Sequence, residues 1–422
     1  DLVRSRGLGD VYKRQLWETI IETAKIGGTE KGGVKRLTLT DLDAQVRHWL
    51  IDKCVAAGCV VSYDDMGNIF ARRPGKDNSL PPIAIGSHLD TQPTGGKFDG
   101  IIGVLAGLEV LRSLNDAGIE TNASIELIDW TNEEGARFAP AMLSSGVFAG
   151  VFSKDYAYER EDREGLRFGD ELKRIGFAGE EACGAHKLAA HFELHIEQGP
   201  ILEDEGKSIG IVTGVQGMRW YGVTVTGMDC HAGTTPMRMR QDALVAAAKM
   251  IQVVQAIALA HGPDAVSTVG LIEARPNSRN VIPGEVFFSI DFRHPNDEVV
   301  AKMEKEVKDA FEKILLGTGI SFTFECIWDS PAVHFDADCI AAVERASADL
   351  GLSARRIVSG AGHDSAYIAK VAPTTMIFVP CEKGISHNEA EKAEPEHIAA
   401  GADVLLQAVL ATDARLAQKQ PA

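Results

Sequence analysis

The sequence predicts an α/β protein with a second, smaller β-α-β-β-α-β domain inserted into it. Short apolar runs that end in polar or Gly-rich loops alternate with segments of helical spacing, which is typical of α/β units. The chain has 422 residues, more than one hydrophobic core ordinarily holds. The element order changes near residue 217 and the first pattern returns after residue 328. We therefore expect a discontinuous larger domain at 16–214 and 329–422, with the insert at 215–328.

The N-terminal part begins with helices and a hairpin. Residues 1–15 lack an initiating Met and show no periodicity, so we expect a fragment end or a foreign leader there. Helical spacing predicts helices over residues 16–25 and 40–57. Alternating residues on both sides of a Gly-Asn turn at 66–68 predict a hairpin.

The most informative stretch follows an apolar run at residues 83–87, which predicts a buried strand. A polar loop with His88, Asp90 and Asp99 comes next, and helical spacing resumes over residues 101–114. Open α/β sheets bind their ligands at the carboxyl ends of strands. Imidazole and carboxylate together suit a divalent metal, although such a loop alone is more often ordinary surface.

Two later strands end in the same kind of residue. The strand expected at 124–130 leads to Glu133 and Glu134, where one carboxylate can bind a metal while its neighbour serves as a general base. A solvated acidic turn is the alternative for that pair. The strand expected at 192–196 carries His195 and is followed by Gln198. A single His is usually structural, but a third strand end of this type favours a functional site.

The insert has the order expected for a ferredoxin-like domain. Its predicted strands and helices are 219–226, 242–261, 265–274, 285–292, 296–315 and 320–327. Polar loops within it contain His231, Asn280 and Arg293. Arg can bind a carboxylate through two hydrogen bonds, and neutral His and Asn donate well to an oxyanion. For each of these residues alone, a surface role is the stronger expectation.

The last part of the chain returns to the first pattern. A Gly-rich loop with Gly362 and His363 enters a helix, and an apolar strand is expected at 374–380. His387 lies in the polar loop after that strand, and a closing helix is expected at 395–416.

Composition narrows the class of protein. The net charge of −17 argues against nucleic-acid binding, which needs a basic surface. We expect no membrane partner, since no apolar run approaches a membrane span, and no secretory signal is visible. The seven cysteines are scattered without a Cys-x-x-Cys pair, so a reducing cytoplasm is the simplest location.

Together these residues form motifs that resemble a known family. The resemblance is to the M20 metallopeptidase-like amidohydrolases, and within them to the branch of N-carbamoyl-L-amino acid hydrolases, β-ureidopropionases and allantoate amidohydrolases. It covers the chain from about residue 16 onward. The motifs are Gly86-Ser-His88-Leu-Asp90-Thr, Phe98-Asp99-Gly100, Thr131-Asn-Glu133-Glu134-Gly135, His195-Ile-Glu-Gln198-Gly, Cys230-His231-Ala-Gly and Ser386-His387-Asn-Glu.

The resemblance implies a catalytic domain with a mostly parallel sheet, an inserted lid and dimerisation domain, and a site with two metal ions. Asp99 would bridge the metals, Asp90 would orient His88, and Glu133 would be the general base and acid. His231 and Asn280 would stabilise the oxyanion from the lid of a partner subunit in a homodimer, and Arg293 would bind the substrate carboxylate. The implied metal ligands are His88, Asp99, Glu134, His195 and His387. The implied pocket residues are Gln198, Gln216, Gly362 and His363.

The expected reaction is cleavage of the ureido C–N bond of an N-carbamoyl amino acid, either an N-carbamoyl-L-amino acid or β-ureidopropionate, to amino acid, carbon dioxide and ammonia. Allantoate hydrolysis is the nearest alternative. An aminoacylase or dipeptidase is more distant, because His195 stands where many peptidase members are expected to have a carboxylate. A non-catalytic relative is a further alternative, although no ligand is lost. Zn²⁺ is the expected metal, and Mn²⁺, Co²⁺ and Ni²⁺ suit the same ligands.

Overall fold

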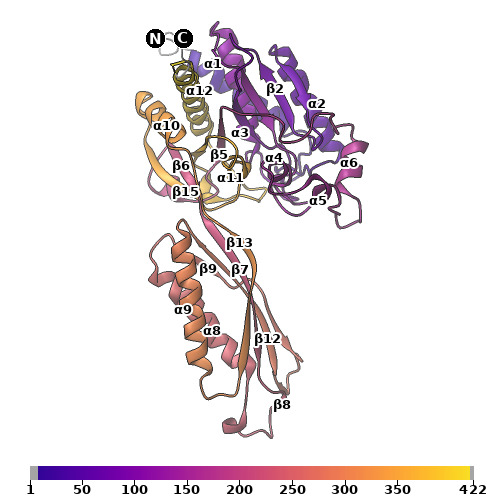
Figure 1. The fold of residues 1–422 in the computed structure, drawn as a ribbon, viewed down its shortest axis with the longest axis vertical. Helices are drawn as coiled ribbons and strands as arrows, with labels where there is room; N and C mark the ends of the chain where they lie inside the picture. Colours follow the sequence, from indigo (N-terminus) through magenta and orange to yellow (C-terminus); the bar gives the residue numbers. More distant parts are fainter. Residues whose placement is uncertain (1–7, 419–422) are drawn as a thin grey trace. The chain divides into compact units, whose positions relative to one another are not determined.

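The computed structural model describes residues 8–418, with side chains from residue 13 onward (Figure 1). The chain divides into two compact units. One comprises the chain up to Gly214 together with the chain from His334 onward, and the other is Val215–Val333. The second unit extends to Val333 because its last long strand, β13, continues to Ser330.

The first unit is a mixed α/β structure built on one large sheet, as expected from the sequence. The strand order is β1-β2-β4-β3-β5-β16-β6-β14, and β15 pairs with β6. The strands are β1 Val60–Tyr63, β2 Ile69–Arg73, β3 Ile83–Ser87, β4 Ile125–Asp129, β5 Ala190–Ile196, β6 Ile209–Val215, β14 Val333–His334, β15 Ala354–Ser359 and β16 Thr374–Val379.

The middle of this sheet is parallel. β3 pairs in parallel with β4 and β5, and β5 pairs in parallel with β16, whereas β1, β2 and β6 join in antiparallel register. Every residue of β3, β4, β5 and β16 is buried, which explains the apolar runs of β3 and β16, whereas β4 and β5 also bury charged or polar residues. Parallel pairing also brings the carboxyl ends of the four strands to one edge.

Helices of the first unit pack in groups. α3 contacts β3, β4 and β5, while α12 contacts α3, α10, β5 and β16. α11 contacts α4, β5 and β16. The helices are α1 Leu8–Thr23, α2 Asp41–Ala56, α3 Ile101–Asp116, α4 Leu143–Phe148, α5 Lys154–Tyr158, α6 Phe168–Arg174, α7 Ile201–Asp204, α10 Ala337–Asp349, α11 Asp364–Ile368, α12 Pro395–Gln418 and the 3₁₀ turn η2 Glu382–Gly384.

The helix predicted from residue 16 begins earlier in the structure. α1 starts at Leu8, so the described part of the segment 1–15 continues directly into this helix. Residues 1–7 lie outside the described residues, and the interpretation of 1–15 as a fragment end or foreign leader stays a prediction.

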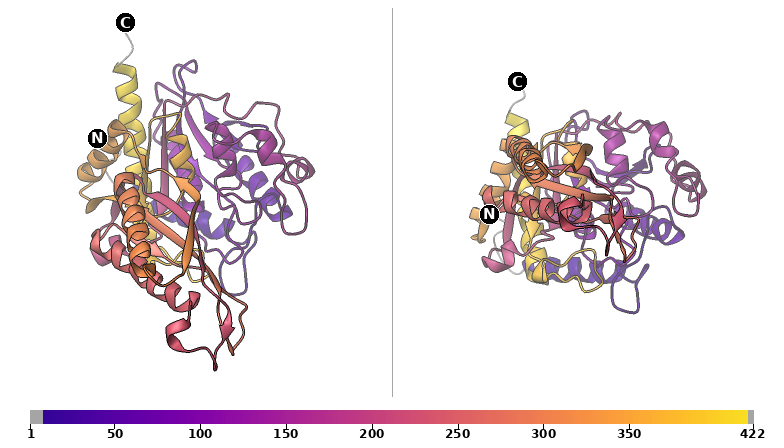
Figure 2. Two further views of the ribbon diagram at one scale, coloured as in Figure 1. Left: turned by 60° about the horizontal axis from the view of Figure 1, so that its bottom comes forward. Right: turned by 90° about the horizontal axis from the view of Figure 1, so that it is seen from below.

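The second unit is an antiparallel sheet packed on two long helices. Its strand order is β10-β12-β7-β13, with β9 also paired to β12, and a separate pair joins β8 and β11. α8 and α9 lie side by side (Figures 1 and 2) and share one apolar core with β7 and β12. The elements are β7 Gly217–Thr226, β8 Cys230–His231, η1 Met237–Met239, α8 Ala243–Ala260, β9 Val266–Thr268, β10 Ile272–Arg275, β11 Val281–Ile282, β12 Glu285–His294, α9 Asp297–Leu315 and β13 Ser321–Ser330.

One predicted strand of the insert is interrupted. The strand expected over 265–274 forms two pieces, β9 and β10, that pair with different parts of β12. Gly270 lies between them, and the N–H of Leu271 donates to the hydroxyl of Ser289 at 3.1 Å instead of continuing the ladder. A glycine inside a strand weakens its pairing, which accounts for the break.

We expected no apolar run near the length of a membrane span, and this expectation is wrong: one helix is long and apolar enough to cross a membrane. Among the described residues, α8 with its 18 residues meets both criteria. Its buried side chains, which include Met250 and Val254, pack into the core with β7, β12 and α9. One third of the helix (33%) is buried inside the structure, and other apolar side chains on it, such as Leu244 and Val245, are exposed.

Candidate metal centre

The predicted ligands of the first unit lie at or just after the ends of four strands, at one edge of the sheet. His88 follows β3 directly, and Glu133 and Glu134 lie in the loop after β4. His195 is near the end of β5, and His387 lies in the loop after β16. Because these four strands run in parallel, residues distant in sequence become neighbours.

His88, Asp99 and His195 form one group that can hold a metal ion. Their candidate ligand atoms all lie within 4.8 Å of one another. Asp99 Oδ1 is 3.1 Å from His195 Nε2 and 3.9 Å from His88 Nε2. All three residues are buried. The group therefore presents two imidazole nitrogens and one carboxylate oxygen to a common point.

The ring orientation of both histidines suits a metal. His88 Nδ1 donates to the main-chain carbonyl of Asp90, and His195 Nδ1 donates to that of Ile196, each at 2.9 Å. Because a carbonyl only accepts, the neutral rings carry their proton on Nδ1 and direct a bare Nε2 at the cluster. In the described part of the chain His88 Nε2 has no hydrogen-bond partner, although it is buried.

Asp99 also belongs to a second group, with Glu134 and His387. His387 Nε2 is 3.4 Å from Glu134 Oε2 and 3.5 Å from Asp99 Oδ2. The two oxygens of Asp99 thus face different groups, which is the geometry of a bridging carboxylate. The His387 side chain is 51% exposed, so this group lies nearer to solvent than the first.

The electrostatics of the cluster favour bound cations. Burial, and then the charge of Asp364, raise the pKa of Glu133 well above its usual value. Burial, and then the charge of Asp99, do the same to the pKa of Glu134. Burial lowers the pKa of His88 to about 4, whereas the hydrogen bond and charge of Asp99 overcome burial and raise the pKa of His195 to about 9. Cations among these carboxylates would relieve both the repulsion and the desolvation.

Asp90 organises the loop that bears the two glutamates. The contact that orients His88 comes from its main-chain carbonyl, while its carboxylate lies 3.7 Å from that ring. The carboxylate instead accepts the N–H groups of Glu133 and Glu134 at 3.2 and 3.3 Å. Glu133 Oε2 is 3.4 Å from His88 Nε2, which places this carboxylate beside the first group.

These residues fit divalent metal ions. Imidazole and carboxylate are the ligands of borderline divalent metals, and Gly100 leaves the necessary space, since a Cβ there would lie 2.2 Å from His88 Nε2. His195 Nε2 has two neighbours with opposite requirements. Asp99 Oδ1, at 3.1 Å, accepts a hydrogen bond and favours a proton on this nitrogen, whereas the Gly100 N–H, at 3.1 Å, donates and requires the nitrogen to be unprotonated. A cation held between imidazole and carboxylate would resolve this conflict. His88, Asp99 and His195 would hold one ion, and Asp99, Glu134 and His387 another.

Sequence reasoning missed two buried glutamates near the cluster. Glu391 accepts the N–H groups of Phe98 and Asp99. Glu193 on β5 accepts hydroxyl hydrogen bonds from Ser87 at 2.7 Å and Ser365 at 2.6 Å. An acidic residue inside an otherwise apolar strand was a usable signal for Glu193. No sequence signal marks the partners of Glu391.

The pocket residues expected in the first unit lie close to the ligands. Gln198 Nε2 donates to Asp99 Oδ2 at 2.9 Å, and it has a left-handed backbone with φ of 57°. Gly362 and His363 precede α11. His363 is 1% exposed, donates or accepts at Ser359 Oγ, and packs edge-on against His195 with 4.5 Å between ring centroids. In this structure His363 supports a predicted ligand rather than facing solvent.

The expected oxyanion donors lie together in the second unit. β8 pairs with β11, and the N–H of Ala232 donates to the carbonyl of Asn280 at 2.9 Å, which joins the two loops. His231 Nδ1 accepts the N–H groups of Gly233 and Thr234 at 3.0 and 3.2 Å, so a neutral ring carries its proton on Nε2. Ser278 Oγ donates to Asn280 Oδ1 at 3.0 Å, which leaves the NH₂ group as the donor end.

The two other predicted residues of the second unit lie at its strand ends. Gln216 is the residue between β6 and β7. Arg293 is on β12, and its guanidinium contacts the Asp291 carboxylate, with Nη2–Oδ2 at 2.9 Å and Nε–Oδ1 at 3.1 Å. A substrate carboxylate at Arg293 would compete with Asp291.

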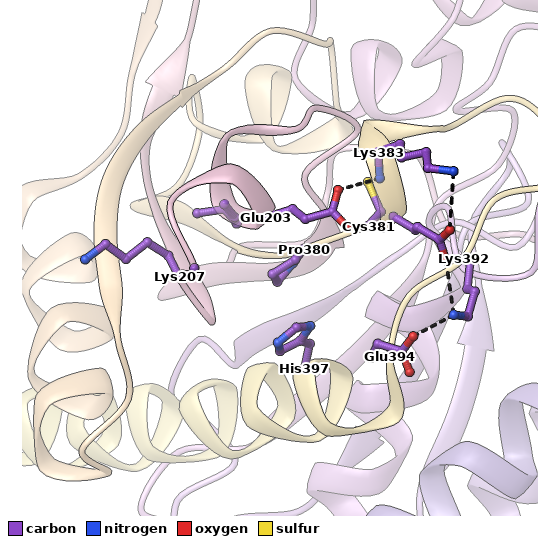
Figure 3. Close-up of a pocket in the computed structure, with 11 residues that line it drawn as sticks. Glu203, Lys207, Pro380, Cys381, Lys383, Lys392, Glu394 and His397 are labelled. Atoms are coloured by element: carbon purple, nitrogen blue, oxygen red, sulfur yellow. Dashed lines mark hydrogen bonds and ion pairs between the residues drawn. The ribbon is translucent and has the colours of Figure 1, made fainter.

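A surface cavity of about 380 Å³ lies beside the segment that follows β16 (Figure 3). Its charged side chains pair with one another: Lys392 Nζ is 3.1 Å from the Glu382 carboxylate and 2.7 Å from that of Glu394. Among the described residues that line it, none is a predicted site residue. We therefore assign this cavity no part in the chemistry.

Residues 84–411 match the sequence profile of peptidase family M20/M25/M40. The chain belongs to the M20 family. The family assignment made from the motifs is thereby confirmed, and the match includes every ligand of the two groups. Members of this family are hydrolases, in agreement with the enzyme class expected from the sequence.

Several M20 relatives are similar over nearly the whole chain. An N-carbamoyl-L-amino-acid amidohydrolase of Rhizobium meliloti is 51% identical, with 94% of this chain and 96% of the relative covered. An allantoate amidohydrolase of Bacillus subtilis is 35% identical, with 93% and 96% covered. A solved amidase of the hydantoinase/carbamoylase family from Burkholderia multivorans is 55% identical, with a TM-score of 0.91 and 95% and 97% covered.

Proposed function

We propose that this M20 protein is a metal-dependent amidohydrolase that cleaves the ureido C–N bond of N-carbamoyl-L-amino acids. The products are the amino acid, carbon dioxide and ammonia. The observation that carries the substrate class is the 51% identity to an N-carbamoyl-L-amino-acid amidohydrolase over 94% of the chain. The cluster of two ligand groups at the sheet edge, with Glu133 beside the group that contains His88, supports the chemistry.

Glu133 is the general base and acid of the proposed reaction. Two divalent cations supply the Lewis acidity that polarises the ureido carbonyl and acidifies the attacking water. Glu133 takes a proton from that water and returns it to the leaving nitrogen. Burial and nearby carboxylates raise the pKa of Glu133, and cations bound beside it would lower this pKa toward the range in which the group can both accept and give a proton. His88, Asp99, Glu134, His195 and His387 are the proposed ligands, and Zn²⁺ is the metal we expect.

The second unit is proposed to supply the groups that recognise the substrate. We assign it the role of a ferredoxin-like lid and dimerisation domain, which the strand order β10-β12-β7-β13 supports, with the first unit as the catalytic domain. His231 and Asn280 each present an N–H donor suited to the oxyanion. Arg293 would bind the substrate carboxylate in place of Asp291. Gln198, Gln216, Gly362 and His363 remain the proposed pocket residues.

A homodimer fits the surface of the second unit. Exposed apolar side chains lie on α8 and around β10, which is an edge strand of the sheet: Leu244, Val245, Leu259, Leu271 and Ile272. Leu244 and Ile272 line one surface cavity of about 480 Å³. An apolar helix face beside an open strand edge is suited to pairing with a second copy.

The seven free cysteines agree with the proposed cytoplasmic location.

The test is ammonia release by metal-reconstituted protein. The substrates are N-carbamoyl-L-alanine, N-carbamoyl-L-methionine, β-ureidopropionate and allantoate, with free amino acid measured from an N-acetyl amino acid. Glu133→Gln should lower kcat on carbamoyl substrates by about 10²–10⁴-fold and keep both metals. Glu134→Gln is the matched comparison and should lose metal.

Each other outcome has a definite meaning. Turnover of allantoate alone would assign the activity of the Bacillus subtilis relative instead. Turnover of the N-acetyl compound alone would indicate an aminoacylase. No turnover of any substrate by protein with two bound metals would overturn the proposed substrate class. Full activity of Glu133→Gln would overturn the role of Glu133.

A further inference from the structure

Glu391 is a buried carboxylate that joins two ligand-bearing loops. It lies four residues after His387 and is 6% exposed. Its Oε1 accepts the main-chain N–H groups of Phe98 at 2.9 Å and Asp99 at 3.1 Å. The loop that carries one proposed ligand, His387, therefore also holds the backbone of another, Asp99.

The surroundings leave Glu391 little freedom to make other contacts. Its own N–H donates to the carbonyl of Asn388 at 3.0 Å, which fixes the start of the side chain. Gly96 provides the space for the carboxylate, since a Cβ there would lie 2.1 Å from Glu391 Oε1. The fit between a glycine, two N–H groups and one carboxylate oxygen is specific in length and direction.

The position of Asp99 determines both ligand groups. Its Oδ1 faces His195 at 3.1 Å, and its Oδ2 faces His387 at 3.5 Å. A small rotation of the Asp99 backbone would move one oxygen out of reach of its group. Ser386 and Gln198 also donate to Oδ2, at 2.5 and 2.9 Å, but they contact only the side chain. On the backbone, the Asp99 carbonyl accepts the Ile101 N–H at 2.7 Å, and Glu391 holds the Asp99 N–H.

We propose that Glu391 is a positioning residue whose acceptor oxygen fixes the Asp99 backbone, so that the two Asp99 oxygens reach both metal sites. The proposal rests on the metal centre of the proposed function. It does not depend on the substrate, because its consequence is metal affinity. The residue acts through Asp99 and touches no reacting atom.

Three variants test separately the length of the Glu391 side chain and the charge of its carboxylate. Glu391→Gln keeps the acceptor oxygen at its place and removes the charge. Glu391→Asp keeps the charge and shortens the side chain, so that the oxygen no longer reaches both N–H groups. Gly96→Ala leaves Glu391 intact and displaces its carboxylate. Glu389→Gln is the control, since this neighbour in the same loop contacts Thr29 and Lys31 instead.

Metal affinity and stoichiometry are measured by titration of the metal-free protein with Zn²⁺ and Co²⁺, and the Co²⁺ absorption spectrum reports the ligand geometry. We expect Glu391→Asp and Gly96→Ala to bind metal about 10–100-fold more weakly at one or both sites and to change the Co²⁺ spectrum. Glu391→Gln and Glu389→Gln should remain within about threefold of the unaltered chain. Circular dichroism establishes that each variant is folded.

Two results would overturn the proposal. Unaltered affinity in folded Glu391→Asp would mean that the contact does not position Asp99. A loss of affinity in Glu391→Gln as large as that in Glu391→Asp would mean that an acceptor oxygen at this place is not sufficient to position Asp99. An unaltered chain that binds no divalent metal would overturn the metal centre as well, whereas normal metal binding without turnover would count only against the proposed substrate class.

Discussion

At the scale of single residues, the proposed metal centre requires a position without a side chain. Gly100 has a left-handed backbone with φ of 68°, and its N–H lies 3.1 Å from His195 Nε2. A side chain there would occupy the space in front of His88 Nε2. This position therefore combines two demands that only glycine meets, a positive φ and close approach of the backbone to a ligand atom.

Gly100→Ala should remove metal binding at the His88 group. The added methyl would lie where an ion must sit, and the positive φ adds a strain of about 1 kcal/mol. We expect the variant to fold and to bind one metal ion fewer, measured by elemental analysis after dialysis. Gly118→Ala is the control, because it shares a positive φ of 63° but has nothing within 4 Å of its Cβ. Full metal content in Gly100→Ala would contradict this geometry.

Glu109 on α3 provides a pH-dependent test away from the ligands. Both of its carboxylate oxygens are buried without a hydrogen-bond partner in the described chain, and Arg112 Nη1 is 3.5 Å away. Burial, partly offset by Arg112, raises the pKa of Glu109 from 4.5 to about 7. Between these values the folded chain holds a proton that the unfolded chain releases, so this stabilising contribution is lost as pH rises.

Glu109→Gln cannot ionise and should therefore abolish this pH-dependent loss of stability. Relative to the unaltered chain, the variant should gain up to about 3 kcal/mol of unfolding free energy between pH 4.5 and pH 8. Urea unfolding of both proteins across this range measures the difference, in which the titration of all other groups cancels. A stability difference that does not change with pH would show that Glu109 titrates normally.

At the scale of elements, parallel pairing decides which residues meet. β3 and β4 approach closely at Gly86, where a Cβ would lie 2.0 Å from the carbonyl oxygen of Ile128. The same spacing sets the distance between the loops that follow these strands, one with His88 and the other with Glu133. Strand packing and ligand geometry are therefore coupled.

Gly86→Ala should disturb both the packing of β3 against β4 and the geometry of the proposed ligands. The added methyl forces β3 and β4 apart, and we expect a loss of about 1–3 kcal/mol of unfolding free energy together with weaker metal binding. Gly270→Ala, in the open segment between β9 and β10, should change neither. Thermal unfolding and metal titration measure the two effects. Normal stability in Gly86→Ala would mean that the sheet can widen there without penalty.

Local sequence patterns predicted most of the helices and strands, and they also predicted the candidate ligands that the structure brings together at the sheet edge. Buried parallel strands such as β3 appear in the sequence as apolar runs, and a polar loop after such a strand marks the functional edge. The break between β9 and β10 was not predicted, because Gly270 weakens a strand without deciding where it ends, and the contact of Leu271 with Ser289 lies on another strand. Glu391 was missed for the same reason. Its partners, Phe98 and Asp99, are nearly three hundred residues away in sequence.

At the scale of the whole molecule, the proposed homodimer predicts a response to charge on α8. Leu259 is 76% exposed on that helix, and Leu316, just after α9, is 84% exposed. Leu259→Glu should shift the protein toward monomers, since burying an unpaired charge in an apolar interface is strongly unfavourable. Leu316→Glu should leave the assembly unchanged. Light scattering across a range of protein concentrations measures this, and an unaltered chain that is monomeric throughout would contradict the dimer.

The order of the ligands along the chain has a consequence for how the protein is made. The proposed ligands run from His88 in the first quarter of the chain to His387 near its end, and β16, which leads to His387, lies inside the sheet between β5 and β6. While the ribosome is still elongating the chain, the sheet is missing an interior strand and Asp99 lacks both His387 and the carboxylate of Glu391. With the proposed ligands, binding of both metals follows translation of nearly the entire chain, and we expect nascent chains that stall before residue 387 to be inactive however well their first strands have folded.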